Sequence, residues 1–183
     1  MPKLSSRPNS NCISLAGEFA VLSQLALRGY DANMTLGRTK GVDILISDPK
    51  TKKMYQLEVK TCIRNLNEKP RNSKLFGKSI ADWIMAKKHE TISNLTLFYC
   101  FVLIHEKTNA FRFFIVPSKL VANYVKKTHR YWLAADKKHK DSLMRVIRIG
   151  LPGEKYKIQP PTTKCEDNWK FANVPVLNGT RYH

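Results

Sequence analysis

Two carboxylates and a lysine stand in short apolar segments, where a charged side chain is costly. Asp43 lies in the segment Gly41-Val42-Asp43-Ile44-Leu45-Ile46, and Glu58 and Lys60 lie in Gln56-Leu57-Glu58-Val59-Lys60. Burying a carboxylate without a partner or a metal costs several kcal/mol, so these residues need an explanation. Because side chains alternate between the two faces of a strand, Glu58 and Lys60 project from one face, about 7 Å apart along the backbone.

Pairing of residues 41–47 with residues 54–62 brings Asp43 close to Glu58. Converging carboxylates suit a hard divalent cation, because Mg²⁺ prefers oxygen ligands. Hydrolysis of a phosphodiester needs an activated water, neutralised charge at phosphorus and a stabilised leaving oxygen. Mg²⁺, or Mn²⁺ in its place, held by Asp43 and Glu58 supplies the Lewis acid. Lys60 then orients or deprotonates the water, or stabilises the developing negative charge. The alternative is a ribbon with an ordinary Glu–Lys pair on a solvated face.

A third acidic residue, Glu18, stands in a predicted helix. On a helical wheel it falls between Leu22 and Leu25, inside the apolar arc that we expect to face the sheet. A carboxylate at this position has two explanations. It either complements the dipole of the first helical turn or reaches a metal ion at the edge of the sheet.

A helical Glu18, then Gly41-Val42-Asp43-Ile44, then Glu58-Val59-Lys60 resembles the PD-(D/E)XK nuclease superfamily, especially its archaeal Holliday-junction-resolvase-like and restriction-endonuclease-like members. The resemblance covers residues 13–116. It implies an α/β/α sandwich around a central mixed sheet, Asp43 and Glu58 as Mg²⁺ ligands, a catalytic Lys60, and Glu18 as a further catalytic acid and metal ligand. Val42 stands where the family has Pro, and so short a motif does not define the DNA substrate.

The charge of the chain indicates a polyanionic partner. The 183 residues include 32 Lys and Arg against 14 Asp and Glu, a formal net charge of +18. DNA is the first partner that this charge suggests, and an acidic membrane surface is the second. The longest apolar run, residues 95–104, has about half the length of a membrane span. No predicted helix pairs a basic face with an exposed apolar face, so we expect no membrane partner. An apolar content of 43% excludes a wholly disordered basic protein.

Basic residues concentrate in two blocks. Residues 60–90 carry eight Lys and Arg against three acidic residues, a net of +5, and residues 119–148 carry nine against two, a net of +7. We expect the first block to contact DNA phosphates through Arg64, Lys69, Arg71, Lys74, Lys78, Lys87 and Lys88. The alternative is a solubilising surface. In the second block, Tyr131 and Trp132 either stack on an unpaired base or pack under a helix predicted over residues 119–127. The histidines have no partner motif, and we assign them no role.

Periodicity and turn residues predict the order of the elements. They indicate helix 13–28 ended by Gly29, strands 41–47 and 54–62 joined as a hairpin, a basic loop 63–78, helix 79–93, strands 95–104 and 111–116, helix 118–127 and strand 145–149. The second helix rests on Ser79 and Asp82, which form an S-x-x-D capping box. The continuous apolar run 95–104 is typical of a central strand covered on both faces.

We expect one nuclease core domain over residues 13–150, preceded by a flexible arm over 1–12 and followed by an extension over 151–183 that packs on the core. The N-terminus lacks the apolar stretch of a secretory signal, and the four cysteines are far apart. A cytoplasmic protein with reduced thiols is therefore expected. Two questions stay open. No residue decides whether the chain forms a homodimer, and a non-catalytic nucleic-acid-binding protein with a degenerate nuclease fold is the second function class.

Overall fold

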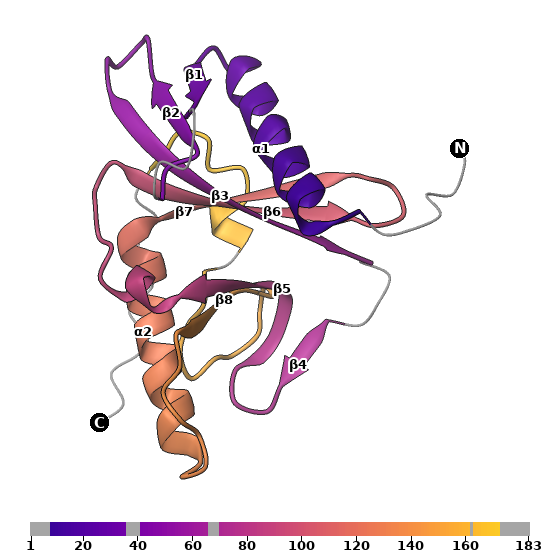
Figure 1. Ribbon diagram of the computed structural model, residues 1–183, viewed down its shortest axis with the longest axis vertical. Coiled ribbons are helices and arrows are strands. Elements are labelled where there is room, and N and C mark those ends of the chain that lie inside the picture. Colours follow the sequence, from indigo (N-terminus) through magenta and orange to yellow (C-terminus); the bar gives the residue numbers. More distant parts are fainter. Residues whose placement is uncertain (1–7, 36–40, 66–69, 162, 173–183) are drawn as a thin grey trace.

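The computed structural model describes residues 8–35, 41–65, 70–161 and 163–172, which form a mixed α/β fold (Figure 1). Its main sheet has the strand order β1 (Asp31–Met34), β2 (Ile44–Ser47), β3 (Met54–Arg64), β6 (Leu97–His105) and β7 (Phe111–Pro117). A smaller sheet has the order β4 (Arg71–Ser73), β5 (Gly77–Ala86) and β8 (Met144–Gly150). The helices are α1 (Ser10–Ala26) and α2 (Ser118–Ala135), with short 3-10 turns η1 (Lys87–Glu90) and η2 (Thr163–Cys165).

The main sheet is mixed, as the sequence predicted. β3 pairs with β6 in parallel, whereas β2–β3 and β6–β7 are antiparallel. Residues 97–104 of β6 are all buried, which confirms the prediction of a central strand with both faces covered. The predicted hairpin is also confirmed, with Ile44 opposite Leu57 and Ser47 opposite Met54.

One face of the main sheet is covered by α1. Val21 and Leu25 of this helix are fully buried and join a core cluster with Leu57 of β3. The segment that follows β8 closes the same layer. Phe171 stacks on Tyr55 with ring centroids 4.8 Å apart, and Tyr30 Oη donates a hydrogen bond to the Trp169 carbonyl at 2.7 Å.

The opposite face is covered by α2 together with the small sheet (Figure 1). Trp83 of β5 packs on Phe101 of β6 with ring centroids 5.2 Å apart, and Ile147 of β8 and Val125 of α2 belong to the same core cluster. The second layer is therefore half helix and half sheet, rather than the purely helical layer expected of an α/β/α sandwich.

The predicted helix over residues 79–93 is wrong, because this segment forms β5. Its buried residues are Ser79, Ala81, Trp83 and Met85, which alternate with more exposed neighbours in the period of two of a strand. The S-x-x-D pattern caps no helix here. Ser79 pairs with Gly150 and Asp82 pairs with Arg148 across the small sheet. Trp83 is buried from this strand.

Other boundaries differ from the sequence-based expectation. α1 begins at Ser10, where Asn9 accepts a hydrogen bond from the Cys12 amide, so residues 10–12 of the predicted arm are helical. The predicted loop 63–78 is also wrong in part, because β3 continues to Arg64 and β4 follows at Arg71–Ser73. β1 was not predicted. α2 continues to Ala135 and so contains Tyr131 and Trp132, which therefore do not pack underneath it. Neither described helix has the length and apolarity that crossing a membrane requires.

Candidate active site

Asp43 directly precedes β2 and lies where β3 extends beyond this neighbouring strand. Its backbone amide donates to the Leu57 carbonyl at 2.9 Å, and its Oδ2 accepts a hydrogen bond from the Val59 amide at 2.7 Å. Because β2 starts only at Ile44, this carboxylate satisfies an amide that β2 does not reach. Burial raises the pKa of Asp43. The Val59 amide and the charge of Lys60 act against this rise, and the charge of Glu58 adds to it.

Glu58 and Lys60 leave β3 on the same face, as the strand period predicted. Lys60 Nζ lies 2.7 Å from Glu58 Oε1. The Glu58 side chain is buried, whereas a third of the Lys60 side chain is exposed. The backbone hydrogen bond between Asp43 and Leu57 joins Asp43 to the residue that precedes Glu58. The alternative of a solvated ribbon is wrong for Glu58, because its carboxylate is inside the protein.

His89 has no role in the sequence-based prediction, yet its buried ring lies against Glu58. His89 Nε2 is 3.9 Å from Glu58 Oε1, and His89 Nδ1 is 3.3 Å from Tyr99 Oη. Burial lowers the pKa of His89, so the neutral imidazole is favoured. Burial, followed by the charge of Glu58, raises the pKa of Tyr99. No sequence signal identifies His89, because η1 is one short turn without a readable period.

One oxygen of the Glu58 carboxylate has no hydrogen-bond partner among the described residues. This atom, Oε2, is buried, and a Cβ placed on Gly41 would lie 3.5 Å from it. Gly41 has a φ of +81°, a conformation that favours glycine. A desolvated carboxylate oxygen is stabilised by a cation. Oε2 is therefore directed toward the segment that carries Asp43, and it is suited to act as a ligand of a metal ion.

Glu18 reaches the same region from α1. The helix starts at Ser10, so Glu18 stands in the third turn, and the explanation by the first-turn dipole is wrong. Burial raises the pKa of Glu18, and the charge of Asp43 raises it further, whereas Lys60 opposes the rise. Glu18, Asp43 and Lys60 together line a cleft of about 700 Å³. Glu58 does not line this cleft, but its buried carboxylate is paired with Lys60, which does.

The face of α1 that packs on the sheet differs from the predicted apolar arc. Gly17, Val21 and Leu25 are buried, whereas Leu15 is 48% exposed and Phe19 is 53% exposed. A Cβ on Gly17 would lie 1.9 Å from Thr61 Oγ1, so this glycine allows the helix backbone to approach β3 closely. The close approach turns the helix and places Glu18 at the border of the packed face, beside the cleft.

The small sheet forms the far wall of the cleft. Its outer face contributes Arg71, Asp82, Ile84, Met144 and Val146. Arg71 forms an ion pair with Asp82 across β4 and β5. This wall therefore combines an ion pair with apolar side chains, which can contact the phosphates, sugars and bases of a nucleic-acid strand.

The seven predicted phosphate-binding residues occupy different environments. Arg71 lines the cleft, whereas Arg64 donates a hydrogen bond to the Ile80 carbonyl and ties β3 to β5. Lys78 pairs with Glu154, and Lys87 pairs with Asp141. The side chains of Lys74 and Lys88 are exposed. Lys69 lies outside the described residues.

The donor chemistry of the cleft fits a magnesium ion, although the ligands do not converge on one point. Within residues 8–35, 41–65, 70–161 and 163–172, no three His, Cys, Asp or Glu side chains are placed together to hold a metal. The fit rests on Glu58 Oε2, which is buried without a partner in this part of the chain, and on the carboxylates of Asp43 and Glu18, which line the cleft. Comparison with known proteins finds no family model, no curated protein and no solved structure that matches this chain.

Glu18→Gln is expected to raise the melting temperature at neutral pH without metal, and to weaken the Mg²⁺ dependence of DNA cleavage. When the pKa of a carboxyl group is higher in the folded than in the unfolded protein, the folded protein becomes less stable as the pH rises between these two pKa values. The amide removes this cost and the repulsion from Asp43, but it also removes an anionic ligand. Melting curves with and without Mg²⁺ measure the first effect, and a Mg²⁺ titration of cleavage measures the second. An unchanged Mg²⁺ response with a lower melting temperature would remove Glu18 from the active site.

Proposed function

We propose that this chain is a Mg²⁺-dependent DNA endonuclease with a restriction-endonuclease-like fold. The observation that carries the proposal is the cleft in which Asp43 and Lys60 stand side by side, with the Glu58 carboxylate paired to Lys60 through one oxygen and unsatisfied at the other. The net charge of +18 supports a polyanionic substrate.

Each candidate residue has a distinct task in this proposal. Asp43 and Glu58 supply carboxylate oxygens for Mg²⁺, with Glu18 as a further ligand, and the ion would act as the Lewis acid at the phosphoryl group. Lys60 Nζ holds the attacking water or neutralises the charge that develops on the phosphate oxygens. Arg71 on the opposite wall binds the phosphate backbone and keeps the strand in the cleft.

A second candidate, a non-catalytic nucleic-acid-binding protein, is favoured by two observations. The described residues include no preformed group of three metal ligands, and Lys60 is engaged with Glu58. In this case Lys60 only neutralises the buried Glu58 carboxylate of the same strand, and the basic surface alone binds DNA.

Incubation of supercoiled plasmid with the full chain and Mg²⁺, with Mn²⁺ or with EDTA separates the two candidates. We expect nicked or linear product with either metal and none with EDTA, because the carboxylates need a cation to act on a phosphodiester. Linear, nicked, four-way and single-stranded substrates then identify the structure that is cut. DNA binding without cleavage under both metals would contradict the endonuclease and support the second candidate.

A further inference from the structure

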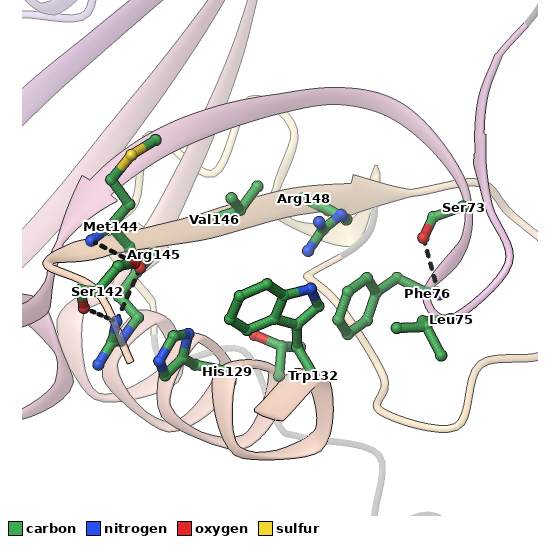
Figure 2. Close-up of a pocket in the computed structure, with 11 residues that line it drawn as sticks. Ser73, Leu75, Phe76, His129, Trp132, Ser142, Met144, Arg145, Val146 and Arg148 are labelled. Atoms are coloured by element: carbon green, nitrogen blue, oxygen red, sulfur yellow. Dashed lines mark hydrogen bonds between the residues drawn. The ribbon is translucent and has the colours of Figure 1, made fainter. Parts of the chain in front are cut away.

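A second cavity of about 480 Å³ lies between α2, β8 and the β4–β5 hairpin (Figure 2). Its walls carry the aromatic rings of Phe76 and Trp132, the cationic side chains of Arg145 and Arg148, and the imidazole of His129. Pockets of a few hundred Å³ accept small organic ligands, and this volume accommodates a single nucleotide. The candidate active site does not use these residues.

The rings and the guanidinium of this cavity are already stacked. Arg148 lies over the Phe76 ring, 4.2 Å from its centroid. Trp132 stacks on His139 with ring centroids 4.0 Å apart and on His129 at 5.5 Å. Proteins bind unpaired bases on aromatic side chains and on Arg guanidinium planes, because every base has a π-face. The lining therefore has aromatic rings and a guanidinium plane, which is the chemistry that a nucleobase requires.

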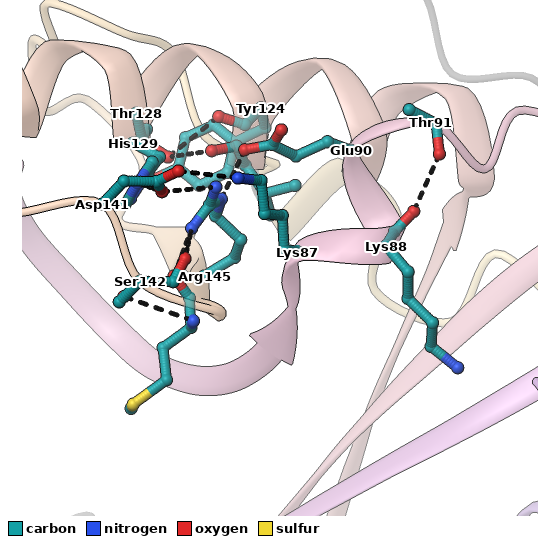
Figure 3. Close-up of polar contacts among 12 residues, drawn as sticks. Lys87, Lys88, Glu90, Thr91, Tyr124, Thr128, His129, Asp141, Ser142 and Arg145 are labelled. Atoms are coloured by element: carbon teal, nitrogen blue, oxygen red, sulfur yellow. Dashed lines mark hydrogen bonds and ion pairs between the residues drawn. The ribbon is translucent and has the colours of Figure 1, made fainter.

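A network of charges includes the buried Arg145, which lines the cavity, and the exposed Lys87 and Asp141 (Figure 3). Arg145 is 2% exposed, pairs with Glu90 and Asp141, and donates to the Ser142 carbonyl at 2.6 Å. Asp141 also contacts Lys87 at 2.6 Å and His129 at 2.9 Å. These contacts tie η1, α2 and the start of β8 together.

The cavity adjoins the candidate active site. Met144 and Val146 line both the cleft and the cavity, so one strand, β8, separates the two. Along this border Ile84 is 66% exposed and Met144 is 55% exposed, which leaves apolar surface that a base can cover. Bases in a duplex are stacked and paired, and only an unpaired base can leave the helix axis to reach such a site.

We propose that this cavity binds one unpaired nucleotide of a DNA strand that runs through the cleft, with the base against Phe76 and Trp132. The inference deepens the proposed function and rests on it for the identity of the strand in the cleft. It specifies the substrate class as DNA with an unpaired segment next to the cutting site, rather than a blunt duplex. Exposed Lys74 and Arg130, on two of the elements that form the cavity, supply positive charge to the flanking phosphates.

Binding of fluorescently labelled DNA in EDTA tests this inference without cleavage. The probes are a short single strand, a blunt duplex of the same sequence and the duplex with an unpaired overhang. Phe76→Ala and Trp132→Ala are expected to weaken binding of the single strand and the overhang by about 5- to 100-fold, and to leave the blunt duplex unchanged. Phe111→Ala, which truncates an exposed ring of β7, is the matched control and should change none of the three.

Two outcomes overturn the inference: unchanged single-strand binding in a folded Phe76→Ala variant, or an equal loss for single-stranded and blunt DNA. Phe76 lies in the β4–β5 turn and is partly exposed, so its truncation keeps the test valid even where Trp132→Ala fails to fold. The failure of the proposed function is distinguishable. Metal-dependent cleavage with unaffected binding in both variants rejects the cavity alone, whereas cavity-dependent binding without any cleavage rejects the nuclease alone.

Discussion

Asp43→Asn, Glu58→Gln and Lys60→Met are each expected to lower the rate of Mg²⁺-dependent DNA cleavage by roughly 100-fold or more. Each substitution removes a charge but keeps the size of the side chain. In Asp43→Asn the new amide oxygen can still accept the hydrogen bond from the Val59 amide, so the end of the hairpin stays in place. Because all three groups act on one phosphodiester, a double variant should be little slower than the slowest single variant.

Single-turnover cleavage of the preferred substrate measures the rate, and DNA binding in EDTA shows whether the variants still bind. Lys50→Met is the matched control, because Lys50 is an exposed lysine in the turn at the other end of the same hairpin. It should cut like the unchanged protein. Wild-type rates in all three active-site variants would place the nuclease chemistry elsewhere or exclude it.

Gly17→Ala is expected to lower the free energy of unfolding by about 1–3 kcal/mol, although alanine is the better helix former. The added methyl group would lie 1.9 Å from Thr61 Oγ1 and 2.9 Å from Thr61 Cβ, so α1 or β3 must move. Since Glu18 follows Gly17 directly, the displacement should also slow cleavage. Denaturant unfolding measures the stability, and the cleavage assay measures the second effect.

Two further variants test whether steric crowding against Thr61 causes the loss of stability in Gly17→Ala. Thr61→Ala removes the closest contacting atom, a buried hydroxyl oxygen that has no hydrogen-bond partner among the described residues, and it should restore much of the stability of Gly17→Ala. Ser23→Ala places alanine at an exposed position of the same helix and should cost nothing. A Gly17→Ala protein as stable as the original would show that α1 does not approach β3 as closely as described.

The hairpin and its charged residues were predictable because strand geometry leaves little freedom. The period of two placed Glu58 and Lys60 on one face, and the short polar turn placed Asp43 beside them. The apolar run 95–104 identified β6 for a similar reason, since only a strand covered on both sides tolerates it.

The features that the sequence did not predict depend on tertiary contacts. The S-x-x-D pattern of Ser79 and Asp82 predicted a helix where β5 forms. A capping box is a local signal, whereas the pairing of β5 with β8 joins segments that are distant in the sequence. A helical wheel of α1 considers only the positions of apolar side chains. It gives no weight to Gly17, which is important because the absence of a side chain allows α1 to approach β3 closely. The contact of His89 with Glu58 has no counterpart in any sequence period.

The last described segment of the chain packs back into the layer formed by α1. This arrangement determines the order in which parts of the protein can fold during synthesis. Trp169 and Phe171 fill the space between Tyr30, Tyr55 and the sheet, and they are synthesised after every strand of both sheets. Contacts that join such distant parts of the chain form late, because the entropic cost of loop closure precedes the gain from the contact. The layer that carries Glu18 is thus completed only after the rest of the core has been made, and a nascent chain exposes the faces of Tyr30 and Tyr55 that Phe171 covers to the solvent and to chaperones until then.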